Sequence, residues 1–136
     1  MSSTATVLYT AAELLNHYGL HTGDHFASTN GHLDINAAIF RAVTGSAPNC
    51  FLDNDDRALL LIQTNEPAME AIRALSAALP TEPPTDPETG ADDYIEHLAG
   101  WATTAPIGHG APPTELEVIG VIVRAANGLR RTALAA

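Results

Sequence analysis

Three histidines and one aspartate form the densest group of potential metal ligands in the chain. They are His17, His21, Asp24 and His25. On an uninterrupted helix, the four-residue spacing of the histidines would place them on one face, where their imidazoles could bind a divalent metal ion. Gly19 and Gly23 interrupt this spacing, and glycine disfavours a helix interior. We therefore expect exposed side chains around a turn and no bound cofactor, with a small metal-binding protein or metal-dependent enzyme as the alternative.

Two other groups of residues suggest chemistry but lack an essential member. Asp53, Asp55 and Asp56 resemble the opening of a calcium-binding loop, but the glycine and the bidentate glutamate that such a loop requires do not follow. Helix capping and hydration are the roles that we expect for these carboxylates. His97 adjoins Glu96, as an acid–base pair would require, but no nucleophile accompanies it in the sequence. We predict no catalytic residues.

The net charge of −10 restricts the partners of the protein. Nucleic-acid binding depends on Lys and Arg contacts to phosphates, so we exclude it. Eleven of the sixteen acidic residues lie between Asp53 and Glu96, where the only basic residues are Arg57 and Arg73. This acidic segment is typical of a hydrated surface, and it could also dock onto a basic surface of a partner.

The length of 136 residues fits one domain, spanning residues 1–136. Apolar residues make up 46% of the chain but aromatic residues only 5%, which favours close packing of helices through Ala, Leu, Ile and Val. Cys50 is the single cysteine, which excludes an internal disulfide and a cysteine-based zinc site and predicts a cytoplasmic location. No apolar stretch approaches the roughly 18 residues of a membrane span, so we expect a soluble protein.

A β-hairpin is predicted from Leu20 to Asp34, around Asn30-Gly31. This dipeptide is preferred in two-residue type I′ turns because both central residues there need a positive φ. A lone hairpin is only marginally stable in water, so we expect it to pack on helices. Its exposed edge near Thr29, Asn30 and Gly31 is a candidate contact site.

About five helices are expected around this hairpin, giving a mainly α (α+β) fold. Apolar residues recur at helical spacing in the segments up to Gly19, Ile35–Thr44, Arg57–Gln63, Ala68–Leu79, from Asp92 or Asp93 past Trp101, and Thr114–Leu129. Arg57–Gln63 is short enough that a strand stays possible. Residues 46–54 are predicted to form a loop. Residues 80–90, with four prolines, are predicted to form a flexible linker.

The last of these helices is apolar on almost every side before Arg124. A helix of this kind is either central to a fold or part of a subunit interface. We expect Asn127-Gly128 to end it. A homodimer through the helix Thr114–Leu129 is therefore one possible assembly.

The order of these elements resembles a known family. The residues that carry the likeness are Tyr18-Gly19-Leu20, the hairpin that ends in Gly31, Ala37-Ala38-Ile39, Trp101, and Thr114-Glu-Leu-Glu-Val-Ile. The chain resembles a family of small actinobacterial and phage proteins that is known only as a domain of unknown function. Leu20 stands where that family has a tryptophan, and Ala102-Thr103 replaces Asn-Asp after Trp101. The resemblance implies a fold and no activity.

These observations favour a non-catalytic binding or accessory protein that acts through contacts with a protein partner or with itself. The predicted contact residues are Thr29, Asn30, Gly31, Asp53, Asp55 and Asp56. A small-molecule binding protein, with a pocket between the hairpin and the helices, is a further alternative.

Overall fold

Seven α-helices account for most of the chain in the computed structural model, which describes residues 3–135 and the side chains of residues 3–134. They are α1 (Thr4–Tyr18), α2 (Ile35–Thr44), α3 (Cys50–Asp53), α4 (Asp55–Gln63), α5 (Glu66–Ala78), α6 (Tyr94–Thr103) and α7 (Glu115–Ala135). The mainly helical fold predicted from the sequence is confirmed. Arg57–Gln63, which the sequence left between helix and strand, is the body of α4.

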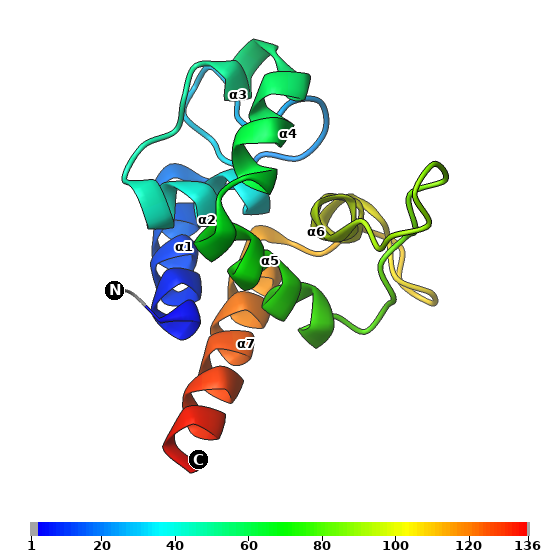
Figure 1. Cartoon of the computed structure of the whole chain (residues 1–136). Coiled ribbons are helices and arrows are strands. Elements are labelled where there is room, and N and C mark those ends of the chain that lie inside the picture. Colours follow the sequence, from blue (N-terminus) through cyan, green and yellow to red (C-terminus); the bar gives the residue numbers. More distant parts are fainter. Residues whose placement is uncertain (1–2, 136) are drawn as a thin grey trace.

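Four of the helices enclose most of the core. α1 packs against both α7 and α2, and α5 contacts all three of these helices (Figure 1). Leu8, Leu15, Ile39, Leu75 and Ile122 are fully buried between them. α6 lies beside α5 and α2. The core is thus built from aliphatic side chains, as the low aromatic content requires.

Side-chain caps fix where several helices begin. Asp34 accepts a hydrogen bond from the Ala37 amide at the start of α2 (2.7 Å), as the sequence predicts. Asn54, rather than Asp55 or Asp56, caps α4 by accepting from the Arg57 amide. The two aspartates instead occupy the first turn of α4, where the helix dipole favours negative charge.

The predicted β-hairpin does not form. Residues 20–34 contain only isolated bridges, and Leu33 takes part in two of them, with Leu20 and with Ala27. The chain does reverse, but the Gly31 amide donates to the Ser28 carbonyl oxygen (3.0 Å), so Thr29 and Asn30 are the central residues of the turn. Asn30 does not have the positive φ that a type I′ turn requires. The turn type predicted from Asn30-Gly31 is therefore wrong.

Two antiparallel backbone hydrogen bonds link the arms beside the turn, from the Ser28 amide to the His32 oxygen (2.9 Å) and from the Asp34 amide to the Phe26 oxygen (2.8 Å), and contacts outside the segment limit the antiparallel pairing to these. The amides of Phe26 and Ala27 both donate to the Phe51 carbonyl oxygen (3.0 and 3.1 Å), so this arm is attached to α3. The arm that follows the turn cannot continue as a strand beyond Leu33, because Asp34 already caps α2. Gly23 and His25 have positive φ values of 104° and 68°, which bends the backbone out of a strand conformation.

Two other boundaries differ from the prediction. α3 occupies part of the expected loop 46–54. α7 continues through Asn127-Gly128 to Ala135, and the Asn127 side chain accepts a hydrogen bond from the Tyr9 hydroxyl. A glycine costs a helix only about 1 kcal/mol, and the good helix formers that follow Gly128 offset it.

The apolar helix α7 is central to the fold. Val118, Ile122 and Ala126 are fully buried on it. Leu116, by contrast, is 74% exposed. In the part of the chain that the structure describes, no helix combines the length and the apolar character needed to cross a membrane.

The proline-rich segment 80–90 forms an excursion beside α6 (Figure 1). Its ends are held together, since the Asp93 amide donates to the Pro84 carbonyl oxygen and the Asp86 amide to that of Ala91 (2.7 Å each). The flexibility of this segment stays a prediction.

Candidate functional site

A groove of about 290 Å³ lies between residues 23–26, the start of α4 and the first turns of α6. We call it the acidic groove. Its lining includes six carboxyl groups, those of Asp24, Asp34, Asp55, Asp56, Asp93 and Glu96, and one basic side chain, that of His25. The acidic segment of the sequence thus supplies only part of this site, because Asp24 and Asp34 come from the segment before it.

Three helix N-termini supply most of these carboxyl groups. Asp34 caps α2, Asp55 and Asp56 begin α4, and Asp93 caps α6. Each helix end carries roughly half a positive charge. Three such ends offset only part of the charge of the lining carboxylates, so the groove stays negative.

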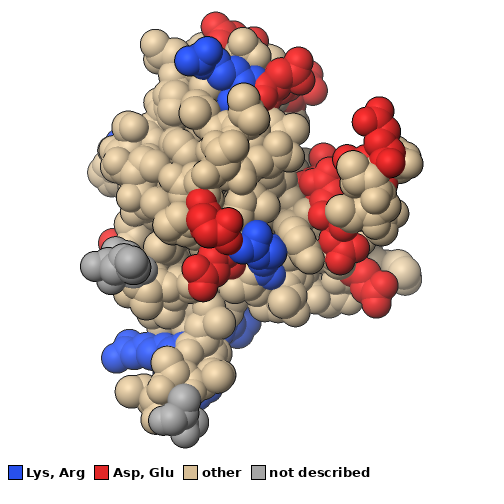
Figure 2. All heavy atoms as spheres, viewed as in Figure 1, with Lys and Arg blue, Asp and Glu red and all other residues tan. Residues whose placement is uncertain are grey.

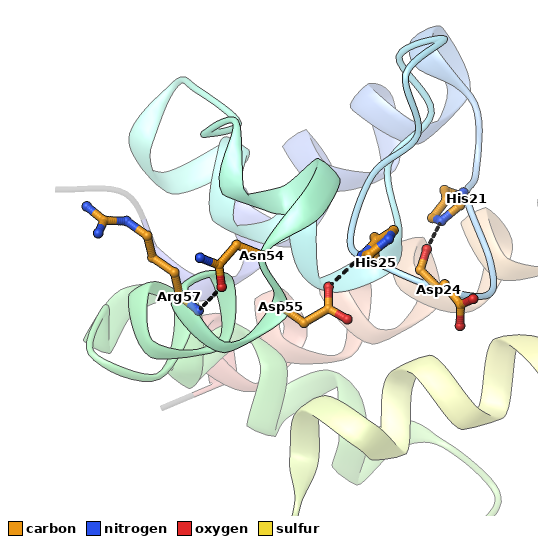
Figure 3. A network of polar contacts seen from close by, with 6 residues as sticks. All are labelled: His21, Asp24, His25, Asn54, Asp55 and Arg57. Carbon is orange, nitrogen blue, oxygen red and sulfur yellow. Dashed lines mark hydrogen bonds and ion pairs between the residues drawn. The ribbon is translucent and has the colours of Figure 1, made fainter.

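His25 joins the two walls of the groove. Its Nδ1 lies 2.9 Å from Oδ1 of Asp55, and the backbone of His25 is left-handed (Figure 3). The hydrogen bond to Asp55 and the charges of Asp55, Asp24 and Asp53 raise the pKa of His25. The contact joins residues 23–26 to the start of α4, so these two parts of the chain form one surface.

Asp34 lies at the buried end of the groove and is only 8% exposed. Burial raises its pKa to about 7, although hydrogen bonds from Ala37 and Asn36 oppose this. The Asp34 carboxyl therefore keeps its proton to a higher pH than an exposed aspartate does. A cation placed in the groove would favour the ionised form and lower this pKa.

Asn36 positions α6 against α2. Its Nδ2 donates to the Ile95 carbonyl oxygen (3.1 Å) and approaches Oδ2 of Asp34 (3.5 Å). Asn36 is fully buried, and its Oδ1 has no hydrogen-bond partner. The amide therefore serves to fix the first turn of α6, from which Asp93 and Glu96 reach the groove.

The potential metal ligands of the sequence are not brought together. The His17 ring packs edge-on against Tyr18, the His21 Nε2 lies 2.6 Å from the backbone oxygen of Asp24, and His25 pairs with Asp55 (Figure 3). Across residues 3–134, no three His, Cys, Asp or Glu side chains are grouped in a way that could hold a metal ion.

The predicted contact residues divide into three sets. Asp55 and Asp56 line the acidic groove, and Asp53 is exposed outside it. Thr29, Asn30 and Gly31 are exposed at the turn. Sequence reasoning missed Asp34, Asp93 and Glu96 as groove residues. The sequence holds part of the signal, because Asp34 and Asp93 each directly precede a helical segment, where aspartate is a preferred N-cap.

Charge is unevenly distributed over the rest of the surface. In the view of Figure 2, acidic side chains gather at the end with α3 and α4 and along the segment before α6. Basic side chains lie near the far end of α7, which carries Arg124, Arg130 and Arg131, and others lie beside acidic side chains at the end with α3 and α4 and in the middle of this face.

Comparison with known proteins identifies a family and nothing closer. No match is found among curated proteins or among solved structures. The model of a family described as "Family of unknown function (DUF6197)" matches residues 1–128. The chain belongs to this family of unknown function.

Proposed function

We propose that this protein is a non-catalytic binding protein whose acidic groove takes up a basic segment of a protein partner. The observation that carries the proposal is the convergence of six carboxyl groups on one concave surface, with His25 as the only basic group in its lining. An arginine or lysine side chain complements both the charge and the shape of such a groove. If these carboxyl groups served only to hydrate the surface, they would not need to line a concave groove.

Two features suit the groove to a protein segment. Its mouth is formed by carboxylates that are exposed, including Asp24, Asp55, Asp56 and Glu96, so a guanidinium can reach them without unfolding the chain. The neighbouring turn residues Thr29, Asn30 and Gly31 are also exposed, and we propose that they extend the contact surface. We propose a cytoplasmic location for this function, because a chain with a single cysteine suits a reducing compartment.

The state of Asp34 gives the proposal a specific signature. With a pKa of about 7, Asp34 is partly protonated in the free protein at neutral pH. A cationic side chain in the groove favours the carboxylate, so binding releases part of a proton. Contacts with exposed carboxylates elsewhere on the surface would release none from this buried group.

A fluorescently labelled peptide with three arginines separated by glycines tests the proposal, and the same peptide with citrulline in place of arginine is the control. We expect binding that weakens at high salt and that is about tenfold weaker for the double variant Asp55→Asn/Asp56→Asn. Asp53→Asn is the matched protein control, because Asp53 is exposed nearby but does not line the groove. Calorimetry in two buffers of different ionisation enthalpy measures the released proton.

An equal loss of affinity in Asp53→Asn would mean that the peptide binds to diffuse negative charge. Full affinity in Asp55→Asn/Asp56→Asn would place the peptide outside the groove that these two residues line. Either result would rule out the groove as the binding site.

Self-association through α7 is the second candidate. Leu116 (74%) and Leu134 (79%) are exposed on that helix, and we propose that a second copy of the chain covers them. Light scattering of the protein and of Leu116→Glu tests it. A monomer over the whole concentration range would exclude this assembly.

A further inference from the structure

A second pocket lies on the other side of Glu96, between residues 80–84, α6 and residues 104–107. Its volume is about 400 Å³, which is within the range of small-molecule sites. The indole of Trp101 and the rings of Pro80, Pro84 and Pro106 line it. Ile107 lies in the same lining and is fully exposed to solvent, with a relative exposure of 104%. We call this the proline pocket.

One polar pair enters this apolar lining, formed by His97 and Thr81. His97 is 4% exposed, and its Nδ1 lies 2.6 Å from the Ser76 hydroxyl on α5. Its Nε2 lies 2.8 Å from the Thr81 hydroxyl. The imidazole is thus held at both nitrogens, and Thr81 is the exposed end of the chain of hydrogen bonds.

The Thr81 hydroxyl keeps one hydrogen-bonding role free for a ligand. If Nε2 carries the proton, it donates to Thr81, whose own proton is then free to be donated. If Nε2 is unprotonated, Thr81 donates to it and its lone pairs can accept. In both cases the pocket offers one directed hydrogen bond beside flat apolar walls.

The same three side chains have the order of a nucleophile, a base and an orienting group, but the electrostatics oppose catalysis. A carboxylate behind the histidine would stabilise an imidazolium, and here the neutral hydroxyl of Ser76 takes that position. Burial lowers the pKa of His97, so accepting the proton of Thr81 is unfavourable. The pair is suited to holding a ligand.

We propose that the proline pocket binds an uncharged, planar one- or two-ring molecule that carries a single hydrogen-bonding group such as a carboxamide. Flat rings stack on indole and proline faces. The pocket is large enough for such rings, since a cavity of about 150 Å³ already accommodates benzene. Glu96 is the only charged side chain in the lining, because the lowered pKa of His97 leaves its imidazole neutral at pH 7, so an anion is disfavoured. The proposal does not depend on the acidic groove.

Trp101 is the only tryptophan in the chain and reports on the pocket directly. The test titrates isotopically labelled protein with benzamide and with benzoate, which has the same shape and a negative charge, and follows the indole N–H signal by NMR. We expect a saturable shift with benzamide and at least about fivefold weaker binding of benzoate, because the nearby Glu96 charge repels the carboxylate and the apolar walls disfavour its desolvation.

Thr81→Val should weaken benzamide binding about fivefold, the effect of one hydrogen bond. Thr85→Val is the matched control in the same segment, because Thr85 is exposed and lies outside the pocket lining. Ala105→Phe provides an independent test, since it adds a ring to the pocket wall at an exposed position and should abolish the shift.

The proposal is overturned if benzamide gives no saturable shift, if benzoate binds as well as benzamide, or if Thr81→Val and Thr85→Val bind alike. Turnover of 4-nitrophenyl acetate that requires Thr81 would also overturn it, in favour of catalysis at the same site. None of these results would affect the binding of the arginine peptide to the acidic groove.

Discussion

His25 lines the acidic groove and His97 lines the proline pocket. The two histidines experience opposite electrostatic environments. His25 is exposed, pairs with Asp55 and has a raised pKa. His97 is buried between two hydroxyl groups and has a lowered pKa. Glu96, which precedes His97, lines both the acidic groove and the proline pocket. One turn of α6 thus separates a site suited to cations from a site suited to uncharged molecules.

The difference arises from how each histidine is supported. His25 belongs to a segment that is held by long-range contacts to α3 and α4, so its environment depends on the packing of that segment. His97 belongs to a helix and contacts α5 through Ser76. Changes to the first region should therefore affect charge recognition, and changes to the second should affect the apolar pocket.

The largest expected effect is that of Phe51→Ala. Phe51 is fully buried, and its ring packs against those of Phe26 and Phe40, with centroid distances of 5.7 and 5.3 Å. Loss of such a ring typically destabilises a protein by about 3–5 kcal/mol. Because Phe26 would lose its partner, we also expect the contact between His25 and Asp55 to loosen. Urea unfolding measures the first effect and the NMR titration of His25 the second.

Leu98→Ala is the control for this variant. Leu98 is fully buried on α6, and its truncation should cost about 2–5 kcal/mol without changing the titration of His25. If both variants change that titration equally, the two regions are not independent.

A smaller loss of stability, about 2–3 kcal/mol, is expected for His97→Ala. The substitution leaves the buried Ser76 hydroxyl without its partner and opens a cavity, and each of these is costly. Unfolding by urea at pH 7.5 measures it. Affinity for the arginine peptide should not change, and a parallel loss of that affinity would contradict the separation of the two sites.

Asp34→Asn should change how stability depends on pH. The folded pKa of about 7 lies above the ordinary value of 3.8, so between these values the folded protein binds more protons than the unfolded chain. Stability therefore falls as the pH rises through this window, by at most about 1.4 kcal/mol per pH unit. Asparagine is also a good N-cap, so the variant should keep α2 while losing this dependence.

The measurement compares the free energy of urea unfolding of the parent protein and of Asp34→Asn from pH 5 to pH 8. His97 contributes with the opposite sign, because its lowered pKa causes stability to be lost as the pH falls below 6.5. The difference between the parent and Asp34→Asn cancels this contribution. Asp93→Asn, a similar replacement at the cap of α6, accounts for the change of cap residue. An unchanged slope in Asp34→Asn would mean that Asp34 is ionised in the folded protein over the whole range.

The helices could be predicted from sequence because their signals are local. In Ile35–Thr44, helical spacing, the Asp34 cap and Gly45 agree, and the structure has the same bounds. In the segment 20–34, the reversal near Asn30-Gly31 was also predictable. Its hydrogen-bond pattern was not, because the carbonyl oxygen of Phe51 takes the donors of Phe26 and Ala27 from a distant part of the chain.

The candidate sites were predictable only in part, for the same physical reason. Asp55 and Asp56 stand out in the sequence as a cluster, but the groove forms because three helix N-termini converge, and this depends on tertiary packing. His97 was noted beside Glu96. Its true partners, Ser76 and Thr81, are 21 and 16 residues away, and no local pattern indicates them.

The smallest expected effect is a shift in the titration midpoint of His25 in Asp55→Asn. It tests the comparison of the two histidines most directly. NMR titration should give a midpoint above 6.5 for His25 and below 6.5 for His97, with assignments from His25→Gln and His97→Gln. In Asp55→Asn, the His25 midpoint should fall because its main stabilising partner is removed, whereas that of His97 should stay unchanged. The raised pKa of His25 implies that the pairing with Asp55 stabilises the fold at low pH and is lost as the pH rises through the folded pKa. If Asp55→Asn leaves the His25 midpoint unchanged, the left-handed backbone of His25, rather than its charge, holds the segment against α4.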